Sequence, residues 1–179
     1  MMSTAAAWLL AATAAAFIPA TGHQGVREAK PSAQSFLQKA AEEQQAEIVL
    51  GRLASENAGD EQVKQFGSQM MQDHRKASAE IQQLASKQGV VLPTELTGKH
   101  REKKEEFSRL SGREFDRAYM EYMLRDHRKD VKEFERHVKT INNPEVQRWA
   151  EGAVPLLKQH LRQAQQIAGS IGIGAAAAP

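Results

Sequence analysis

The chain has 179 residues, the length of one domain, and its 24 basic and 22 acidic side chains are mixed along the sequence. This mixing argues against the single-sign surface that nucleic acid binding requires, so we predict no nucleic acid partner. The lack of cysteine excludes disulfides, thiolate metal ligands and a cysteine nucleophile. Few aromatic residues and abundant Ala, Gln, Glu, Lys and Leu predict an all-α fold.

The N-terminal segment differs in kind from the rest of the chain. Residues Ala5–Ile18 form an apolar run of about the length of a signal peptide, followed by small residues, although no basic residue precedes Arg27. We interpret residues 1–22 as a signal peptide and 23–32 as a linker, which predicts a periplasmic or secreted protein without stable membrane insertion of the mature domain. An uncleaved anchor, which would be short for a membrane span, and a misplaced start codon are the alternatives.

Two helices are expected after the linker. Ser32 is a suitable N-cap for a helix over residues 33–57. Asp60 then caps a second helix, over residues 61–88, which stops at a glycine. Because only a short break separates them, these two helices should form an antiparallel hairpin.

A long connection precedes the third long helix. It carries a charged segment at 99–110 that predicts a short extra helix. Ser111 and Glu114 match a capping box, in which each side chain satisfies the backbone amide of the other residue. A third long helix should therefore begin here and run to about residue 141.

The fourth long helix should begin at Asn143 and Pro144, since proline is favoured in the first helical position after an asparagine cap. We expect it to end near residue 168 and to be followed by a flexible tail at 169–179. Residues 33–168 then form two hairpins joined by a long crossover, which is typical of a ferritin-like four-helix bundle. A plain up-and-down bundle is the alternative, because loop length alone does not decide the topology.

A heptapeptide pattern occurs twice, at residues 70–76 and 123–129, each time inside a long helical segment. At about 100° per residue, the spacing sets His74 and His127 in the middle of two apolar stripes. A core-facing imidazole loses its hydration, so each ring needs a buried hydrogen-bond partner or a metal ion.

The other two long helices carry one inward polar candidate each, Glu47 and His160. All four residues lie near the midpoints of their helices and hence at about one level of the bundle. One carboxylate and three imidazoles at one level predict a site for a divalent ion, with zinc, iron, manganese or copper all open. We therefore predict Glu47, His74, His127 and His160 as metal ligands.

Four further side chains lie near this level: Asp73, Asp126, Asp130 and Tyr119. We expect them to hold the imidazoles in place by hydrogen bonds, with Asp130 a candidate additional ligand. The alternative is a buried hydrogen-bonded network with no metal. The methionines at helical spacing are interpreted as core residues rather than copper ligands, and His100 and His137 have no convergent partner in the sequence.

Five stretches of the sequence together carry a resemblance to a known family. They are Ala46–Gly51, Val63–Gly67 with Met70 and Asp73–His74, Leu92–Leu96, Phe115–Met120 with Asp126–His127, and Leu156–Leu161. Through them the chain, from Phe36 to about Ala168, resembles a family of exported bacterial proteins that carry a ferritin-like domain of unknown function, often labelled outer-membrane proteins. The resemblance implies a ferritin-like bundle outside the cytoplasm and no particular activity.

The pattern departs from di-iron members of the ferritin-like fold, which place Glu-x-x-His on two helices. Met71 and Leu157 stand three residues before His74 and His160, so the two bridging carboxylates are absent. A di-iron oxidase is therefore not expected, and no nucleophile or phosphate loop indicates another enzyme. The leading hypothesis is a bundle that binds one metal ion for metal handling or envelope stress, and the alternative is a structural or stress-response envelope module with a metal-free polar core.

Overall fold

The computed structural model describes residues 32–173, and within that range the chain is all-helical, as its composition predicts. The predicted signal peptide, residues 23–31 of the linker and residues 174–179 of the tail lie outside the described residues. Within 32–173 no helix combines the length and the apolar character that a bilayer crossing requires. Five helices follow one another: α1 (Ala33–Asn57), α2 (Glu61–Lys87), α3 (Gly98–Ser108), α4 (Gly112–Val138) and α5 (Pro144–Ser170).

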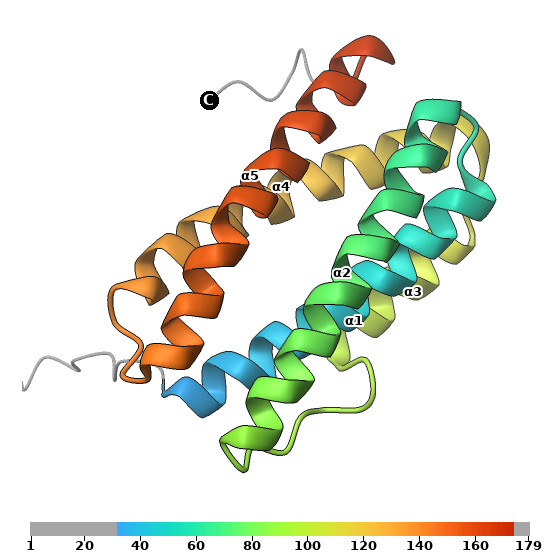
Figure 1. Ribbon diagram of the computed structural model, residues 1–179. Coiled ribbons are helices and arrows are strands. Elements are labelled where there is room, and N and C mark those ends of the chain that lie inside the picture. Colours follow the sequence, from blue (N-terminus) through green and yellow to red (C-terminus); the bar gives the residue numbers. More distant parts are fainter. Residues whose placement is uncertain (1–31, 174–179) are drawn as a thin grey trace, which may run out of the picture.

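The four long helices form two hairpins, α1 with α2 and α4 with α5 (Figure 1). Phe36 at the start of α1 packs edge-on against Phe134 near the end of α4, with ring centroids 5.3 Å apart. Lys87 at the end of α2 pairs with Glu145 at the start of α5 at 2.7 Å. α2 and α4 therefore run in the same direction, and the connection that carries α3 returns along the length of the molecule between them.

Local signals account for most helix starts. Ser32, Asp60 and Asn143 each accept a backbone N–H of the first helical turn, at 2.8–3.1 Å, as predicted. The capping box at the start of α4 is wrong, because the Ser111 side chain makes no capping hydrogen bond. The next residue, Gly112, has φ +57°, and this left-handed backbone breaks the geometry in which a serine reaches the N–H three residues on.

The start of α4 is fixed instead by a contact distant in sequence. The buried carboxylate of Asp116 accepts the backbone N–H of Gly59 at 2.9 Å and that of Asp60 at 3.0 Å. A Cβ on Gly59 would lie 2.9 Å from the Cα of Gly112, so the close approach requires glycine. Asp116 thus joins the α1–α2 turn to the first turn of α4.

The ends of the last two long helices differ slightly from the prediction. α4 ends at Val138 rather than near residue 141, because the N–H groups of Thr140 and Ile141 both turn back to the carbonyl of His137. α5 ends at Ser170 rather than near 168, and Ile173 beyond it is buried against the core. The first residues of the predicted tail are therefore part of the fold.

Two apolar clusters fill the interior, one at each end of the helices. One contains the aromatic side chains of Phe66, Phe107 and Phe115, and the other contains Phe36 and Phe134. Between them each long helix contributes buried polar side chains: Gln44 and Glu47 from α1, His74 from α2, His127 and Asp130 from α4, and His160 from α5. The predicted alignment of polar residues at one level is present as a polar layer between two apolar halves.

α1 and α2 approach each other closely beside this layer. A Cβ built on Gly51 would lie 2.6 Å from the carbonyl oxygen of Gly67, and one on Gly67 would lie 2.5 Å from the Cβ of Ala54. Neither position has room for a side chain, so the two glycines set the distance between the helices. This distance places side chains of α1 within hydrogen-bonding reach of His74.

Candidate functional site

Three histidines from three helices meet in the polar layer. The ring centroid of His160 lies 5.5 Å from those of both His74 and His127, and the latter two are 6.2 Å apart. One ring nitrogen from each histidine lies within 4.8 Å of those from the other two. His127 and His160 are fully buried, and His74 is 5% exposed. The structure thus brings together three of the four residues that the sequence nominated as ligands.

Each ring is held by one hydrogen bond to an acceptor. Nδ1 of His74 lies 2.7 Å from Oε1 of Gln44, and Nδ1 of His127 lies 3.2 Å from the carbonyl oxygen of Met123. Nε2 of His160 lies 3.1 Å from Oδ2 of Asp73, the role predicted for that aspartate. Because all three partners are acceptors, the proton of each neutral ring is on the bonded nitrogen.

The opposite nitrogen of each ring therefore carries a lone pair. These atoms are Nε2 of His74, Nε2 of His127 and Nδ1 of His160, and all three are buried without a hydrogen-bond partner among the described residues. Leaving a buried polar atom unsatisfied costs about 1–3 kcal/mol. Three such atoms in one cluster are unusual for a packed core, where nearly all buried polar groups are paired.

The electrostatic environment keeps the rings neutral. Burial lowers the pKa of His74 well below its usual value, and the neighbouring His127 and His160 lower it further. Burial likewise lowers the pKa of His127 to about 3, with a further contribution from His160. The pKa of His160 is also lowered by burial, although the Asp73 carboxylate opposes that shift. Neutral imidazoles are the form that coordinates a metal ion.

The spacing of the rings is close to that of a coordination shell. Three imidazole nitrogens about 2.0–2.1 Å from one ion in tetrahedral geometry are about 3.3 Å apart. In the structure one nitrogen of each ring lies within 4.8 Å of one nitrogen of each of the other two. Side-chain rotations that move each nitrogen by about an ångström would bring the three to the spacing of metal ligands. The hydrogen bonds from Gln44 and Asp73 already restrict the orientation of two of the rings.

Glu47 does not join the three histidines in this group. It is 2% exposed, and both of its carboxylate oxygens lack a hydrogen-bond partner among the described residues. Burial raises its pKa well above the usual value, and the charges of Asp126 and Asp130 raise it further. The charges that act on Glu47 are therefore those of α4 carboxylates, and Glu47 in turn contributes to the raised pKa of the buried Tyr119.

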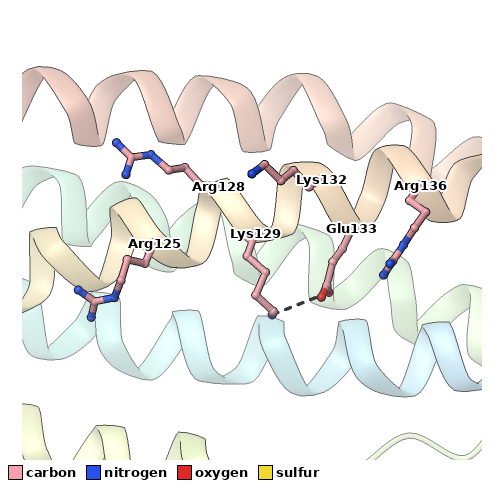
Figure 2. A pocket seen from close by; sticks show the side chains of 6 residues that line it. All are labelled: Arg125, Arg128, Lys129, Lys132, Glu133 and Arg136. Atoms are coloured by element: carbon pink, nitrogen blue, oxygen red, sulfur yellow. Dashed lines mark ion pairs between the residues drawn. The ribbon is translucent and has the colours of Figure 1, made fainter. Parts of the chain in front are cut away.

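A second group of carboxylates lies further out, between α1 and α4. Glu43, Asp130 and Glu133 each offer an oxygen within 4.8 Å of the other two. The ammonium of Lys129 lies 3.9, 3.7 and 3.8 Å from these three residues in turn, and Figure 2 shows its ion pair with Glu133. Lys39 adds an ion pair to Glu133 at 2.5 Å. This outer group is therefore neutralised by lysines and does not require a metal ion.

The contacts of two buried polar residues, Gln44 and His100, were not predicted from the sequence. Gln44 lies one helical turn before Glu47 on the same apolar stripe, and that periodicity could have identified it as an inward polar residue. His100, for which no partner was expected, is buried and its Nδ1 lies 3.0 Å from Oε1 of Glu42. This contact between α3 and α1 depends on the path of the connection, which no local pattern specifies.

Comparisons with known proteins place the chain in a family but give it no activity. The family model described as Domain of unknown function (DUF4142) matches residues 18–167. A solved structure, described as "putative secreted protein DUF305 from Streptomyces coelicolor", superposes with a TM-score of 0.68. It shares 14% sequence identity, and the alignment covers 81% of this chain and 97% of that one. At this identity the likeness concerns the fold alone.

A search of the curated proteins found no match. The family model covers most of the chain, including all four long helices except the last residues of α5. All three converging histidines lie within the matched range. The chain therefore belongs to the family described as Domain of unknown function (DUF4142).

Proposed function

We propose that the protein binds one divalent transition-metal ion through His74, His127 and His160. The observation that carries this proposal is the set of three buried ring nitrogens that have lone pairs and no protein partner. A single cation among them satisfies all three atoms at once, whereas a core without metal leaves them unpaired. Gln44, Asp73 and the Met123 carbonyl act in this account as the outer partners that fix each ring.

The three imidazole ligands restrict which metal ions the site would bind. Three neutral imidazoles suit a borderline ion such as zinc, copper or iron better than magnesium or calcium, which prefer oxygen ligands. Three protein ligands leave a fourth position for water or another small ligand. Glu47 is not needed in this set, and the carboxylates that bridge two ions in di-iron proteins are absent from the positions three before His74 and His160.

We further propose that the domain is a ferritin-like four-helix bundle of an exported protein that handles metal ions in the cell envelope. The two hairpins and the connection that runs between the parallel helices α2 and α4 support the ferritin-like topology. The description of the DUF305 protein as secreted and the apolar run at 5–18 support export. The competing proposal is a structural envelope module whose unpaired imidazoles only fix the packing of the helices.

The metal-binding and the metal-free proposals are distinguished by isothermal titration calorimetry with Zn²⁺. The protein is first treated with a chelator and dialysed. The metal proposal predicts one ion per chain, with affinity reduced at least tenfold in His160→Ala. His137→Gln is the matched control, because this half-buried histidine of α4 contacts Phe36 and lies outside the three-histidine group. A wild-type protein that binds no zinc, or one whose affinity is unchanged by His160→Ala, would leave only the metal-free module.

A further inference from the structure

Helix α4 carries as many basic as acidic side chains, but in its second half they lie on different faces. The helix has seven Lys and Arg residues and seven Asp and Glu residues. At about 100° per residue, the basic positions after residue 124 fall within about 100° of one another around the helix axis. These positions are Arg125, Arg128, Lys129, Lys132 and Arg136. They form a basic stripe on one face of α4, which the mixed charges of the sequence did not indicate.

Four members of the basic stripe have no carboxylate to pair with. Arg125, Lys132 and Arg136 are exposed, and Arg128 is half-buried. Within residues 32–173, none of these four has a carboxylate oxygen within 4.0 Å. The stripe therefore presents a concentrated positive charge to the surroundings of the molecule.

The carboxylates at the two edges of the stripe are paired with other lysines. Glu133 pairs with Lys39 of α1 at 2.5 Å as well as with Lys129. Glu135, on the opposite edge, pairs with Lys158 of α5 at 2.6 Å. Because these partners come from the flanking helices and from the edge of the stripe, the middle of the stripe keeps its full positive charge.

The basic stripe borders an open groove of about 520 Å³ (Figure 2). All six residues that line the groove belong to α4, five of them the stripe itself and the sixth Glu133. A groove that a single helix forms lies on the surface and does not enclose a small molecule. From Arg125 to Arg136 the stripe extends about 16 Å along the helix. An extended anionic surface therefore fits it better than a compact ligand.

We propose that the basic stripe binds the anionic headgroups of a phospholipid membrane, with α4 lying along the membrane surface. Clusters of four to eight Lys and Arg residues on one face of a helix are typical of such contacts, and each basic side chain near the surface strengthens binding about fivefold. The choice of a lipid surface over nucleic acid rests on the export proposed above, which brings the protein to a membrane rather than to nucleic acid.

The contact is electrostatic rather than apolar. Among the described residues, the large hydrophobic side chain that is exposed is Val91, which belongs to the connection between α2 and α3 and not to the stripe. The stripe thus offers nothing to insert between the lipid chains. Binding should therefore weaken as added salt screens the charges.

Cosedimentation of the full chain with lipid vesicles tests the proposal. Two partition coefficients are measured, one for vesicles of phosphatidylglycerol mixed with phosphatidylcholine and one for phosphatidylcholine alone. The apolar run at 5–18 contributes to both, so the ratio of the two isolates the contribution of charge. Wild type should prefer the anionic vesicles at least twentyfold at low ionic strength, and the preference should largely disappear at about 1 M NaCl.

Two quadruple variants with the same change in net charge locate the effect. The stripe variant carries Arg125→Gln, Arg128→Gln, Lys132→Gln and Arg136→Gln. The matched control removes four exposed basic side chains that lie outside the stripe and have no carboxylate within 4.0 Å among the described residues: Arg75→Gln, Lys104→Gln, Arg113→Gln and Arg148→Gln. The preference should fall at least tenfold in the stripe variant and less than threefold in the control, with folding of both confirmed by circular dichroism.

Three results would overturn the proposal. One is equal binding of wild type to the two kinds of vesicle, and another is an equal fall of the preference in the stripe variant and the control. The third is binding to duplex DNA, lost in the stripe variant, by a protein that does not bind anionic vesicles. The test is independent of the three-histidine site, because His160→Ala should bind vesicles as wild type does, whether or not wild type binds zinc.

Discussion

Asp130 should make the metal-free protein less stable as the pH rises from 7 to 8. Burial, followed by the charges of Asp126 and Glu43, raises the pKa of Asp130 from 3.8 to about 8. In the unfolded chain this carboxyl has lost its proton well below pH 7, whereas the folded chain keeps the proton up to about pH 8. Raising the pH therefore favours the unfolded chain across the interval between these two pKa values.

The size of the effect follows from the linkage. A group that is protonated only in the folded state contributes about 1.4 kcal/mol per pH unit. Asp130 begins to lose its proton in the folded protein near pH 8. It therefore lowers the free energy of unfolding by about 1 kcal/mol, rather than the full 1.4, between pH 7 and 8. Glu47, whose pKa is raised in the same direction, adds to the fall. His127 makes stability rise with pH, because burial lowers its pKa in the folded chain. This effect acts between its folded pKa of about 3 and its unfolded value of 6.5, which is below the interval from pH 7 to 8.

Urea denaturation of chelated protein at pH 7.0, 7.5 and 8.0 measures the effect. Wild type should lose stability across this series, and Asp130→Asn should lose about 1 kcal/mol less than wild type between pH 7 and 8. Glu105→Gln, at a side chain that is 61% exposed, should follow wild type. A wild-type stability that is constant or rises over the series would show that the buried carboxyls are ionised in the folded state, and the reasoning would be wrong.

Four further substitutions test the packing and the hydrogen bonds of the fold and the site. Gly67→Ala should lower the free energy of unfolding by about 1–3 kcal/mol, because the added Cβ would overlap α1. Gly152→Ala should raise it by about 0.5–1 kcal/mol, because a Cβ there meets nothing within 4 Å and alanine is the better helix former. Denaturant midpoints that shift in the same direction in both variants would contradict this. Asp116→Ala should cost about 2–4 kcal/mol in the same assay through two lost charged hydrogen bonds, and a loss below 1 kcal/mol would show that the α1–α2 turn does not depend on them. Gln44→Ala should weaken zinc binding about 10–100-fold in calorimetry by freeing the His74 ring, and unchanged affinity would remove Gln44 from the site.

The helices could be predicted from the sequence where their signals are local. Ser32, Asp60 and Asn143 cap the next turn of their own helix, so the residues that decide the helix start are adjacent in the chain. The start of α4 could not be predicted in this way. Its decisive partner, the turn at Gly59 and Asp60, is more than fifty residues away, and the capping-box pattern carries no information about that contact.

The three histidines could be predicted because helical periodicity fixes both the inward face and the axial level of a residue. Periodicity does not predict which residues of a neighbouring helix lie opposite that face. Glu47 is buried as predicted, yet it does not belong to the three-imidazole group. Gln44, one turn earlier, is the α1 residue that reaches His74.

X-ray absorption at the zinc edge of the one-to-one complex tests the central claim most directly. The account predicts three imidazole nitrogens at about 2.0–2.1 Å, identified by their multiple-scattering signature, together with one further light-atom ligand. The imidazole count should fall in His160→Ala. A shell made mainly of oxygen atoms, or a spectrum that is the same in wild type and His160→Ala, would contradict the assignment of His74, His127 and His160 as the metal ligands.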